Sequence, residues 1–135
     1  MRLFDTSFLI DLTNNDTGAV EKAKKVDEEK SLAAVSVITV HEYFLGVHLQ
    51  YSESEELSEK LASAKRDVTP FQVIPLTMEM AEESSRLQAQ MRRKGQPIGI
   101  NDLYIASTAL KLKLSLVTRN TADFRKIPGL KLETY

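Results

Sequence analysis

Short apolar runs alternate with amphipathic stretches along this chain of 135 residues. Runs of the length and composition typical of buried strands occur at residues 3–4, 32–36, 71–76, 115–118 and 130–133. Apolar positions at helical spacing predict helices between these runs, at residues 8–10, 18–30, 39–49, 53–66, 77–94 and 101–112. Strands that alternate with helices favour a mostly parallel sheet covered on both faces. We therefore predict an α/β fold formed by one domain spanning residues 1–135.

The helix at residues 77–94 has the clearest pattern. Thr77 suits the N-cap position, and the last turn is basic before Gly95. One face of this helix is expected to be buried, and it carries Met80, Ser84, Leu87 and Met91. The strand that precedes it contains Pro75, which has no amide hydrogen to donate, so we expect that strand to lie at an edge of the sheet or to end at this residue.

Composition excludes several classes of protein. There are no cysteines, so disulfides, thiolate metal sites, iron–sulfur clusters and cysteine nucleophiles are impossible. Apolar residues make up 42% and charged residues 27%, which is typical of a globular domain and not of a disordered chain. No apolar run approaches the ~18 to 20 residues of a membrane helix, and no export signal is evident. We therefore expect a soluble, cytoplasmic protein with no membrane partner.

Charge is unevenly distributed, although the net charge is only −1. Residues 1–67 carry 8 Lys or Arg and 13 Asp or Glu, a net of −5, whereas residues 68–135 carry 10 and 6, a net of +4. The chain lacks the strong basic excess typical of sequence-independent nucleic-acid binding. A local basic surface in the second half and an ordinary solvated surface both fit this distribution.

Three acidic residues lie where a parallel sheet usually binds its ligands, beyond the carboxyl ends of the strands. Asp5 ends the first predicted strand, and Asp123 lies five residues beyond Thr118, the end of the fourth. Asp102 stands at the start of a helix, on the side that carries apolar residues. We expect these side chains to lie at one edge of the sheet.

A fourth acid, Glu42, shares a helical stripe with Leu45, Gly46 and Leu49 in a segment that is apolar nearly all round. We expect this stripe to face the core, where an acid is costly unless it is paired or bound to a metal. Four acids with few evident partners would repel one another at one sheet edge. A hard divalent cation with oxygen ligands, Mg²⁺ or Mn²⁺, would relieve this repulsion.

Simpler roles are open for most of these acids. Asp102 can cap its helix, Asp5 can start a turn, and Asp123 with Asn120 can cap a short helix. Glu42 has no such role. Asp11 and the other acids of helices and loops are expected to be solvated.

Other motifs fail on spacing. His41-Glu42 begins like a zinc-protease helix, but the second histidine would be at position 45, where Leu45 stands. His41 and His48 are therefore expected to be structural or surface residues. The five glycines form neither a dinucleotide fingerprint nor a phosphate-binding loop.

Four segments spread over the whole chain carry a family resemblance. They are Asp5-Thr6-Ser7-Phe8-Leu9-Ile10, Glu42 in a helix after an alanine-rich strand, Ile98-Gly99-Ile100-Asn101-Asp102-Leu103-Tyr104-Ile105-Ala106, and Thr118-Arg119-Asn120-Thr121-Ala122-Asp123-Phe124. Their four acids follow one another at spacings of 37, 60 and 21 residues. In this order the segments resemble PIN-domain ribonucleases, and among them the small VapC-type toxins of prokaryotic toxin–antitoxin pairs.

The resemblance implies a fold and a set of catalytic residues. The fold is a three-layer α/β/α sandwich with a central, mostly parallel sheet of four or five strands and the acids at its carboxyl edge. Asp5 and Asp102 would bind the metal ion directly, and Glu42 and Asp123 would complete the pocket. Polar support would come from Thr6, Thr118 and Asn120. Position 120 is Asn where some relatives have an acid, which leaves its role open.

The implied reaction is hydrolysis of an RNA phosphodiester with Mg²⁺ or Mn²⁺. A water made acidic by the cation attacks phosphorus in line, and no side-chain nucleophile is needed. Basic residues would hold the substrate phosphates, although each of them is equally well interpreted as ordinary surface: Arg92, Arg93, Lys94, Arg119, Arg125 and Lys126. The implied partners are the RNA, a small VapB-like antitoxin and a second copy of the chain.

Alternative functions are a PIN-domain nuclease of RNA processing outside a toxin system and an RNA-binding module that does not cleave. Two further classes with acids at a sheet edge fit less well. A haloacid-dehalogenase-like phosphatase needs a second aspartate two residues after the first, where Ser7 stands. A receiver domain needs an aspartate at the end of a middle strand, and residues 73–77 supply none.

Overall fold

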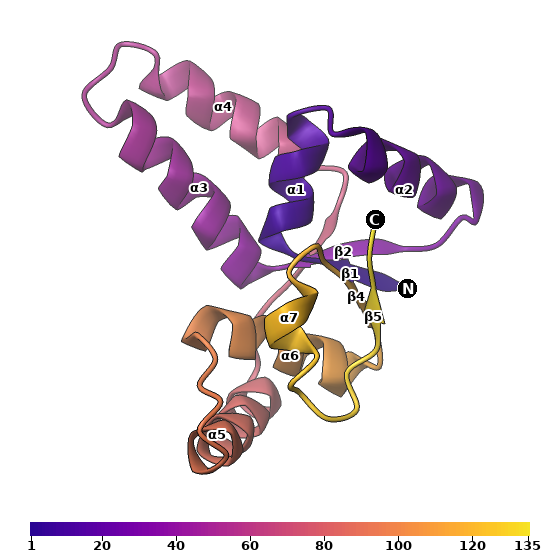
Figure 1. Ribbon diagram of the computed structural model, residues 1–135. Helices are drawn as coiled ribbons and strands as arrows, with labels where there is room; N and C mark the ends of the chain where they lie inside the picture. The colour runs from indigo at the N-terminus through magenta and orange to yellow at the C-terminus, as the bar shows by residue number, and fades with distance from the viewer.

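The computed structural model describes residues 1–135, and its centre is a single parallel sheet. The strands are β1 (Arg2–Phe4), β2 (Ala33–Ser36), β3 (Gln72–Ile74), β4 (Ser115–Val117) and β5 (Leu132–Glu133). Their order is β3-β2-β1-β4-β5, and all four pairings are parallel (Figure 1). The central strand β1 places Leu3 opposite Ala34 of β2 and Leu116 of β4. The carboxyl ends of all five strands therefore lie along one edge.

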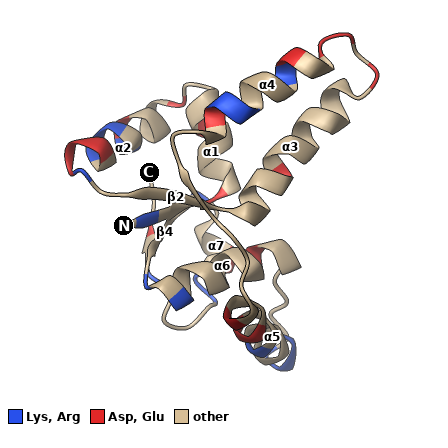
Figure 2. Ribbon diagram, turned by 180° about the vertical axis from the view of Figure 1, so that it is seen from behind, with Lys and Arg blue, Asp and Glu red and all other residues tan.

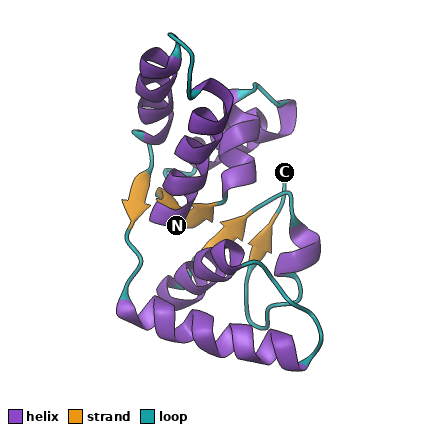
Figure 3. Cartoon of the chain, turned by 90° about the vertical axis from the view of Figure 1, so that its left-hand side faces the viewer, coloured by secondary structure: helices purple, strands orange, loops and turns teal.

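Seven helices cover the two faces of this sheet. They are α1 (Thr6–Thr13), α2 (Thr17–Glu28), α3 (Val37–Tyr51), α4 (Leu57–Val68), α5 (Met78–Arg93), α6 (Ile100–Leu112) and α7 (Thr121–Phe124). Helices α1 to α4 lie on one side, and α5 to α7 lie on the other (Figures 1 and 3). The predicted three-layer α/β/α sandwich is confirmed, with five strands in its sheet. No helix is both long and apolar enough to cross a membrane.

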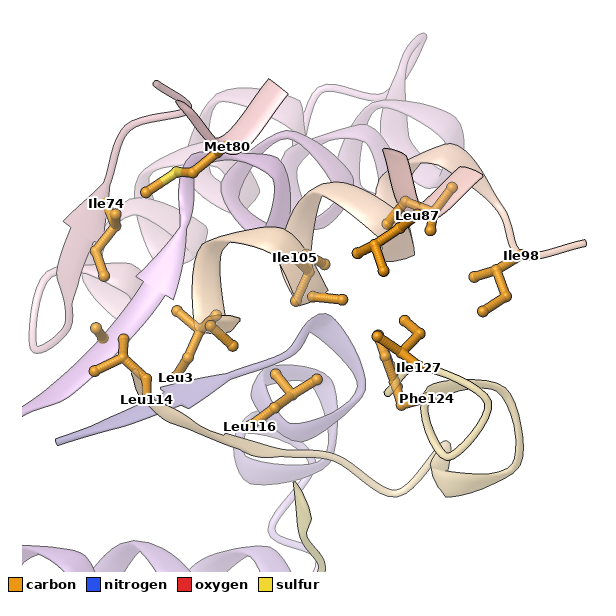
Figure 4. Close-up of a cluster of buried hydrophobic side chains, with 14 of the residues drawn as sticks. Leu3, Ile74, Met80, Leu87, Ile98, Ile105, Leu114, Leu116, Phe124 and Ile127 are labelled. Atoms are coloured by element: carbon orange, nitrogen blue, oxygen red, sulfur yellow. The ribbon is translucent and has the colours of Figure 1, made fainter. Parts of the chain in front are cut away.

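Two hydrophobic clusters hold the layers together, one on each face of the sheet. Successive side chains of a strand point to opposite faces. Leu3, Ala34 and Leu116 accordingly join a cluster of 15 buried residues that packs the sheet against α5, α6 and α7 (Figure 4). The next residue of each strand, Phe4, Val35 and Val117, joins a cluster of 8 with side chains of α1 and α2. Each of these short strands thus contributes side chains to both hydrophobic clusters.

Several predicted elements are confirmed. Helix α5 buries the expected face of Met80, Ser84, Leu87 and Met91, and Thr77 caps it by accepting a hydrogen bond from the Met80 amide at 3.3 Å. Strand β3 lies at an edge, as Pro75 predicts. His41 and His48 are surface residues.

Some helix limits differ from the prediction. Helix α3 begins at Val37, two residues early, because the Ser36 hydroxyl accepts a hydrogen bond from the Ile38 amide at 3.0 Å and caps it. Helix α4 begins only at Leu57, since residues 53–56 form the turn that connects it to α3. This turn carries an exposed acidic group, visible between α3 and α4 in Figure 2.

The orientation predicted for α3 is wrong. The stripe of Leu45, Gly46 and Leu49 faces solvent, with Leu45 45% and Leu49 76% exposed. Helix α3 extends past the sheet and packs along α4, so only its Thr39 is fully buried (Figure 1). A helix that is apolar nearly all round does not reveal by periodicity which side meets the core. Glu42 is therefore half-buried at a boundary and not enclosed.

Candidate active site

The site lies at the carboxyl edge of the two central strands. Asp5 directly follows β1 and Thr118 directly follows β4, and the residues before them, Phe4 and Val117, are paired. The Asp5 amide donates to the Val117 carbonyl at 3.2 Å, so the two strand ends stay together. Helices α1, α3 and α6 bring further polar side chains to this place. The parallel pairing of β1 with β4 therefore brings Asp5 and Thr118 to the same edge of the sheet.

Asp5 is held by three donors although it is only 5% exposed. Its Oδ1 accepts from the Ser7 hydroxyl at 2.7 Å and from the Phe8 amide at 3.0 Å. Its Oδ2 accepts from the Thr118 hydroxyl. Burial raises the pKa of Asp5, while the hydrogen bonds from Thr118, Ser7 and Phe8 oppose that rise. Asp5 is the N-cap of α1, a role different from the turn that was its simpler interpretation, and the cap fixes the carboxylate at the edge of the sheet.

Glu42 connects three helices. Its Oε1 accepts from the Thr6 hydroxyl of α1 at 2.7 Å, and its Oε2 lies 3.5 Å from the amide nitrogen of Asn101 in α6. The hydroxyl oxygens of Thr6 and Thr39 lie 3.2 Å apart, and because Thr6 donates its hydrogen to Glu42, Thr39 is the donor of this pair. The predicted support by Thr6 is thus a direct hydrogen bond. Asn101 was not among the predicted site residues, although its position beside Asp102 at the start of a helix was a usable signal.

Asp102 differs from the other acids because it has neither a hydrogen-bond donor nor a cationic partner and is half-buried. The N-cap of α6 is Gly99, so Asp102 lies in the first turn and does not cap the helix. Burial, and then the negative charges of Glu42, Asp5 and Asp123, raise the pKa of Asp102 to about 6. The four acids therefore share one electrostatic environment.

Asp123 and its neighbours form the more open side of the site. Asp123 lies 3.3 Å from the Lys126 ammonium in an ion pair at the surface. Asn120 begins α7 but makes no side-chain capping bond, and its backbone amide donates to the Thr118 hydroxyl at 2.9 Å. Thr118 therefore links Asp5 to the loop that leads to Asp123.

Of the predicted basic residues, Lys126 pairs with Asp123, whereas the others form no ion pair with any of the four acids. Arg92 and Arg93 are exposed in the last turn of α5 and form no ion pair. Arg119 instead binds Asp11, with 3.0 Å between Nη2 and Oδ1. The prediction that Asp11 is solvated is wrong: it is 7% exposed, and Tyr135 also donates to it at 2.6 Å. Sequence reasoning missed Asp11 because both partners lie more than 100 positions away along the chain.

The four acids do not form a closed cluster. No three of the chain's His, Asp and Glu side chains converge closely enough to enclose a cation as they stand. Glu42 lines a cavity of about 280 Å³ between α1 and α3. A larger cavity of about 580 Å³ lies elsewhere, between α1, α2 and α4, and none of the four acids lines it. Asp5, Asp102 and Asp123 do not line the smaller cavity either, so the candidate active site is defined by the four acids at the edge of the sheet and not by a cavity.

The chain is similar to known proteins over nearly its whole length. The PIN domain family model matches residues 2–130. The chain is 27% identical to "Ribonuclease VapC2" of Rickettsia felis, covering 98% of this chain and 96% of that protein. It is 26% identical to "tRNA(fMet)-specific endonuclease VapC" of Shigella flexneri, with the same coverage of both chains. A solved "Toxin-antitoxin complex from Klebsiella pneumoniae" contains a chain 30% identical, with a TM-score of 0.69 over 96% of this chain and 95% of that one.

Proposed function

The chain belongs to the PIN domain family, and from this premise we propose that it is a divalent-metal-dependent endoribonuclease and the toxin of a toxin–antitoxin pair. The observation that carries the proposal is the Asp102 carboxylate. It is half-buried without a partner and faces the charges of three other acids. Such an unpaired, half-buried carboxylate is typical of a site that binds a cation, because the cation offsets the repulsion among the acids.

The residues fit a divalent cation by their chemistry. Every candidate ligand is a carboxylate oxygen, and Asp5, Glu42 and Asp102 have no Lys or Arg bound to them. Asp5 and Asp102 would hold the ion, with Glu42 and Asp123 completing the pocket after small side-chain movements. Mg²⁺ or Mn²⁺ is the expected ion, and when bound it supplies a Lewis acid and lowers the pKa of a coordinated water.

The chain's own residues orient this set of oxygens. Ser7, Phe8 and Thr118 fix Asp5, and Thr6 with Asn101 fixes Glu42. A carboxyl with a pKa of about 6, as at Asp102, is mostly ionised at neutral pH and is ready to bind a cation. Buried, hydrogen-bonded carboxylates lose little further freedom on binding, which favours a defined geometry.

An antitoxin of the VapB kind is the expected protein partner. An acidic pocket without a cation suits an arginine, whose planar fork binds carboxylates through two hydrogen bonds. We also expect the chain to form a homodimer through the apolar side chains that α3 exposes, including Leu45 and Leu49. Light scattering of the purified chain tests the dimer. The expected place of action is the cytoplasm, where RNA is available.

Cleavage assays on defined RNAs test the activity. Wild-type protein is incubated with single-stranded RNA and with a tRNA in Mg²⁺, Mn²⁺ or chelator. Two variants are assayed in the same way, Asp102→Asn and the control Asp67→Asn. The Asp67 carboxylate binds only the Tyr43 hydroxyl, in another part of the fold. Cleavage by wild type and the control, and none by Asp102→Asn or in chelator, supports the proposal. Binding of RNA without cleavage under all conditions favours the alternative of a non-cleaving RNA-binding module. Cleavage without toxicity in cells favours a nuclease of RNA processing outside a toxin system.

A further inference from the structure

A buried carboxylate outside the four acids ties the loop beside the site to α1. Asp11 lies in α1, six residues after Asp5, and on the same helix face as Ser7. Its Oδ1 accepts from Arg119 at 3.0 Å and its Oδ2 accepts from the Tyr135 hydroxyl at 2.6 Å. Both oxygens are thus satisfied, as a carboxylate with this little exposure requires.

Arg119 is the middle residue of the loop that completes the site. Thr118, the residue before it, donates to Asp5, and the amide of Asn120, the residue after it, donates to the Thr118 hydroxyl at 2.9 Å. The N-cap of α1 and an acid within α1 therefore hold two consecutive residues: Asp5 holds the loop at Thr118, and Asp11 holds it at Arg119. The same loop leads into α7, which carries Asp123.

Tyr135 keeps Asp11 in place from the other side. Its ring packs edge-on against Phe8, with 5.1 Å between ring centroids and an interplanar angle of 87°. Burial and the hydrogen bond to Asp11 raise the pKa of Tyr135, so its hydroxyl remains a donor at neutral pH. Asp11 is thus held between the partly buried Tyr135 side chain and the exposed Arg119 side chain.

We propose that Asp11 is a positioning residue for the active site: through Arg119 it holds the 118–120 loop in register with α1, so that Thr118 orients Asp5 and α7 presents Asp123. This inference rests on the proposed function. Asp11 itself does not touch substrate or metal. Groups that orient metal ligands from behind typically change metal affinity or activity by about 10- to 100-fold when they are removed.

The chain offers a matched control. Asp67 accepts a hydrogen bond from Tyr43 at 2.7 Å, so Asp67→Asn and Asp11→Asn weaken the same kind of tyrosine–aspartate pair. Only Asp11 is joined to the loop. A milder variant, Tyr135→Phe, removes one donor to Asp11 and keeps the ring against Phe8, and it serves if Asp11→Asn does not fold.

Two readouts on the full chain separate a positioning role from a structural one. In chelator, amide hydrogen exchange at Asn120 reports whether the loop is held, with no metal or substrate needed. Mn²⁺ titration followed by electron paramagnetic resonance of the free ion gives the metal affinity. We expect Asp11→Asn to speed exchange at Asn120 and to weaken Mn²⁺ binding by about 10-fold or more, and Tyr135→Phe to act in the same direction but less. Asp67→Asn should change neither by more than about 2-fold, within the usual effect of a distant substitution.

The outcomes are distinct. If exchange at Asn120 and Mn²⁺ affinity in Asp11→Asn and Tyr135→Phe match those of Asp67→Asn, Asp11 is merely structural and the inference is overturned. If exchange at Asn120 speeds up while Mn²⁺ affinity stays at the wild-type value, the loop is held but does not orient the site, which also overturns it. A wild-type chain that binds no Mn²⁺ and cleaves no RNA refutes the proposed function itself, and the positioning role falls with it.

Discussion

Replacing Asp102 with asparagine should stabilise the metal-free protein. The wild-type carboxylate has no hydrogen bond or ion pair to lose, and it faces the negative charges of Glu42, Asp5 and Asp123. An asparagine of nearly the same shape cannot ionise. The substitution therefore removes an unfavourable charge without removing a favourable contact.

The pKa of Asp102 sets the size of this effect. A rise from 3.8 to about 6 corresponds to about 3 kcal/mol against the ionised form at neutral pH, at about 1.4 kcal/mol for each tenfold change in proton binding. Solvent screens a half-buried group, so we expect a gain of about 1 to 2 kcal/mol in the free energy of unfolding. In a domain of this size that raises the melting temperature by about 3 to 8 °C.

The gain should depend on pH with a definite sign. A carboxyl whose pKa is higher in the folded state costs nothing below its unfolded pKa near 3.8. The cost grows between pH 3.8 and about 6, where the unfolded chain releases the proton more readily, and is full above about pH 6. The difference in melting temperature between Asp102→Asn and wild type should thus be full at pH 7 to 8 and shrink toward pH 4. Thermal melts in chelator across this range measure it, with Asp67→Asn as the control that shows no such trend.

Two results would refute the reasoning. One is a melting temperature of Asp102→Asn at or below that of wild type at pH 7.5, which would make the carboxylate a structural group. The other is a gain that stays constant from pH 4 to 8, which would show that it has no electrostatic origin. Adding Mn²⁺ should reverse the order, because the ion stabilises only the protein that binds it.

Three further predictions concern activity and binding. Asp5→Asn should lower the cleavage rate at saturating RNA by at least about 100-fold, because a charged ligand becomes neutral, and should not unfold the protein. Initial rates measure the first effect and circular dichroism the second, and cleavage at the wild-type rate would remove Asp5 from the catalytic set. Replacing both Arg92 and Arg93 with glutamate should raise the apparent KM for single-stranded RNA several-fold with little change in kcat. It should also weaken the salt dependence of binding between 50 and 300 mM, roughly the range where phosphate contacts are screened. An unchanged KM would exclude this end of α5 from substrate binding. Inhibition by the cognate antitoxin should weaken as Mn²⁺ is raised, since an entering arginine and the ion need the same carboxylates; an inhibition constant independent of Mn²⁺ would place the antitoxin contact outside the pocket.

The sequence predicted the parts of this molecule that depend on local pattern. Helix α5 has one apolar face, so its buried residues follow from periodicity alone. Asp5 and Asp123 follow from the ends of parallel strands, whose order along one edge is a general property of the fold. Asp102 and Glu42 were expected at the same edge from their places on apolar helix faces, and the family resemblance added the division of roles among the four acids.

Other features depend on contacts between distant segments and have no local pattern. Helix α3 is apolar on most sides, and only the position of α4 decides that Leu49 is exposed. Asp11 looks like any acid on a helix, and its burial depends on Arg119 and Tyr135 at the other end of the chain. Asn101 reaches Glu42 only because α6 and α3 meet at the sheet edge. These contacts form only when distant segments meet in the folded chain, so the spacing of residues along the sequence does not predict them.

The sheet order has a consequence for when the active site is completed during synthesis of the chain. Strand β1 is made first but stays open on one side until β4 is made more than 100 residues later. A ribosome that has completed α6 has already placed Asp5, Glu42 and Asp102 in the nascent chain, yet Thr118, Arg119 and Asp123 do not exist. Unfinished or prematurely released chains therefore lack both the fourth acid and the loop that orients the first. The set of four acids is therefore complete only when synthesis of the chain is nearly finished.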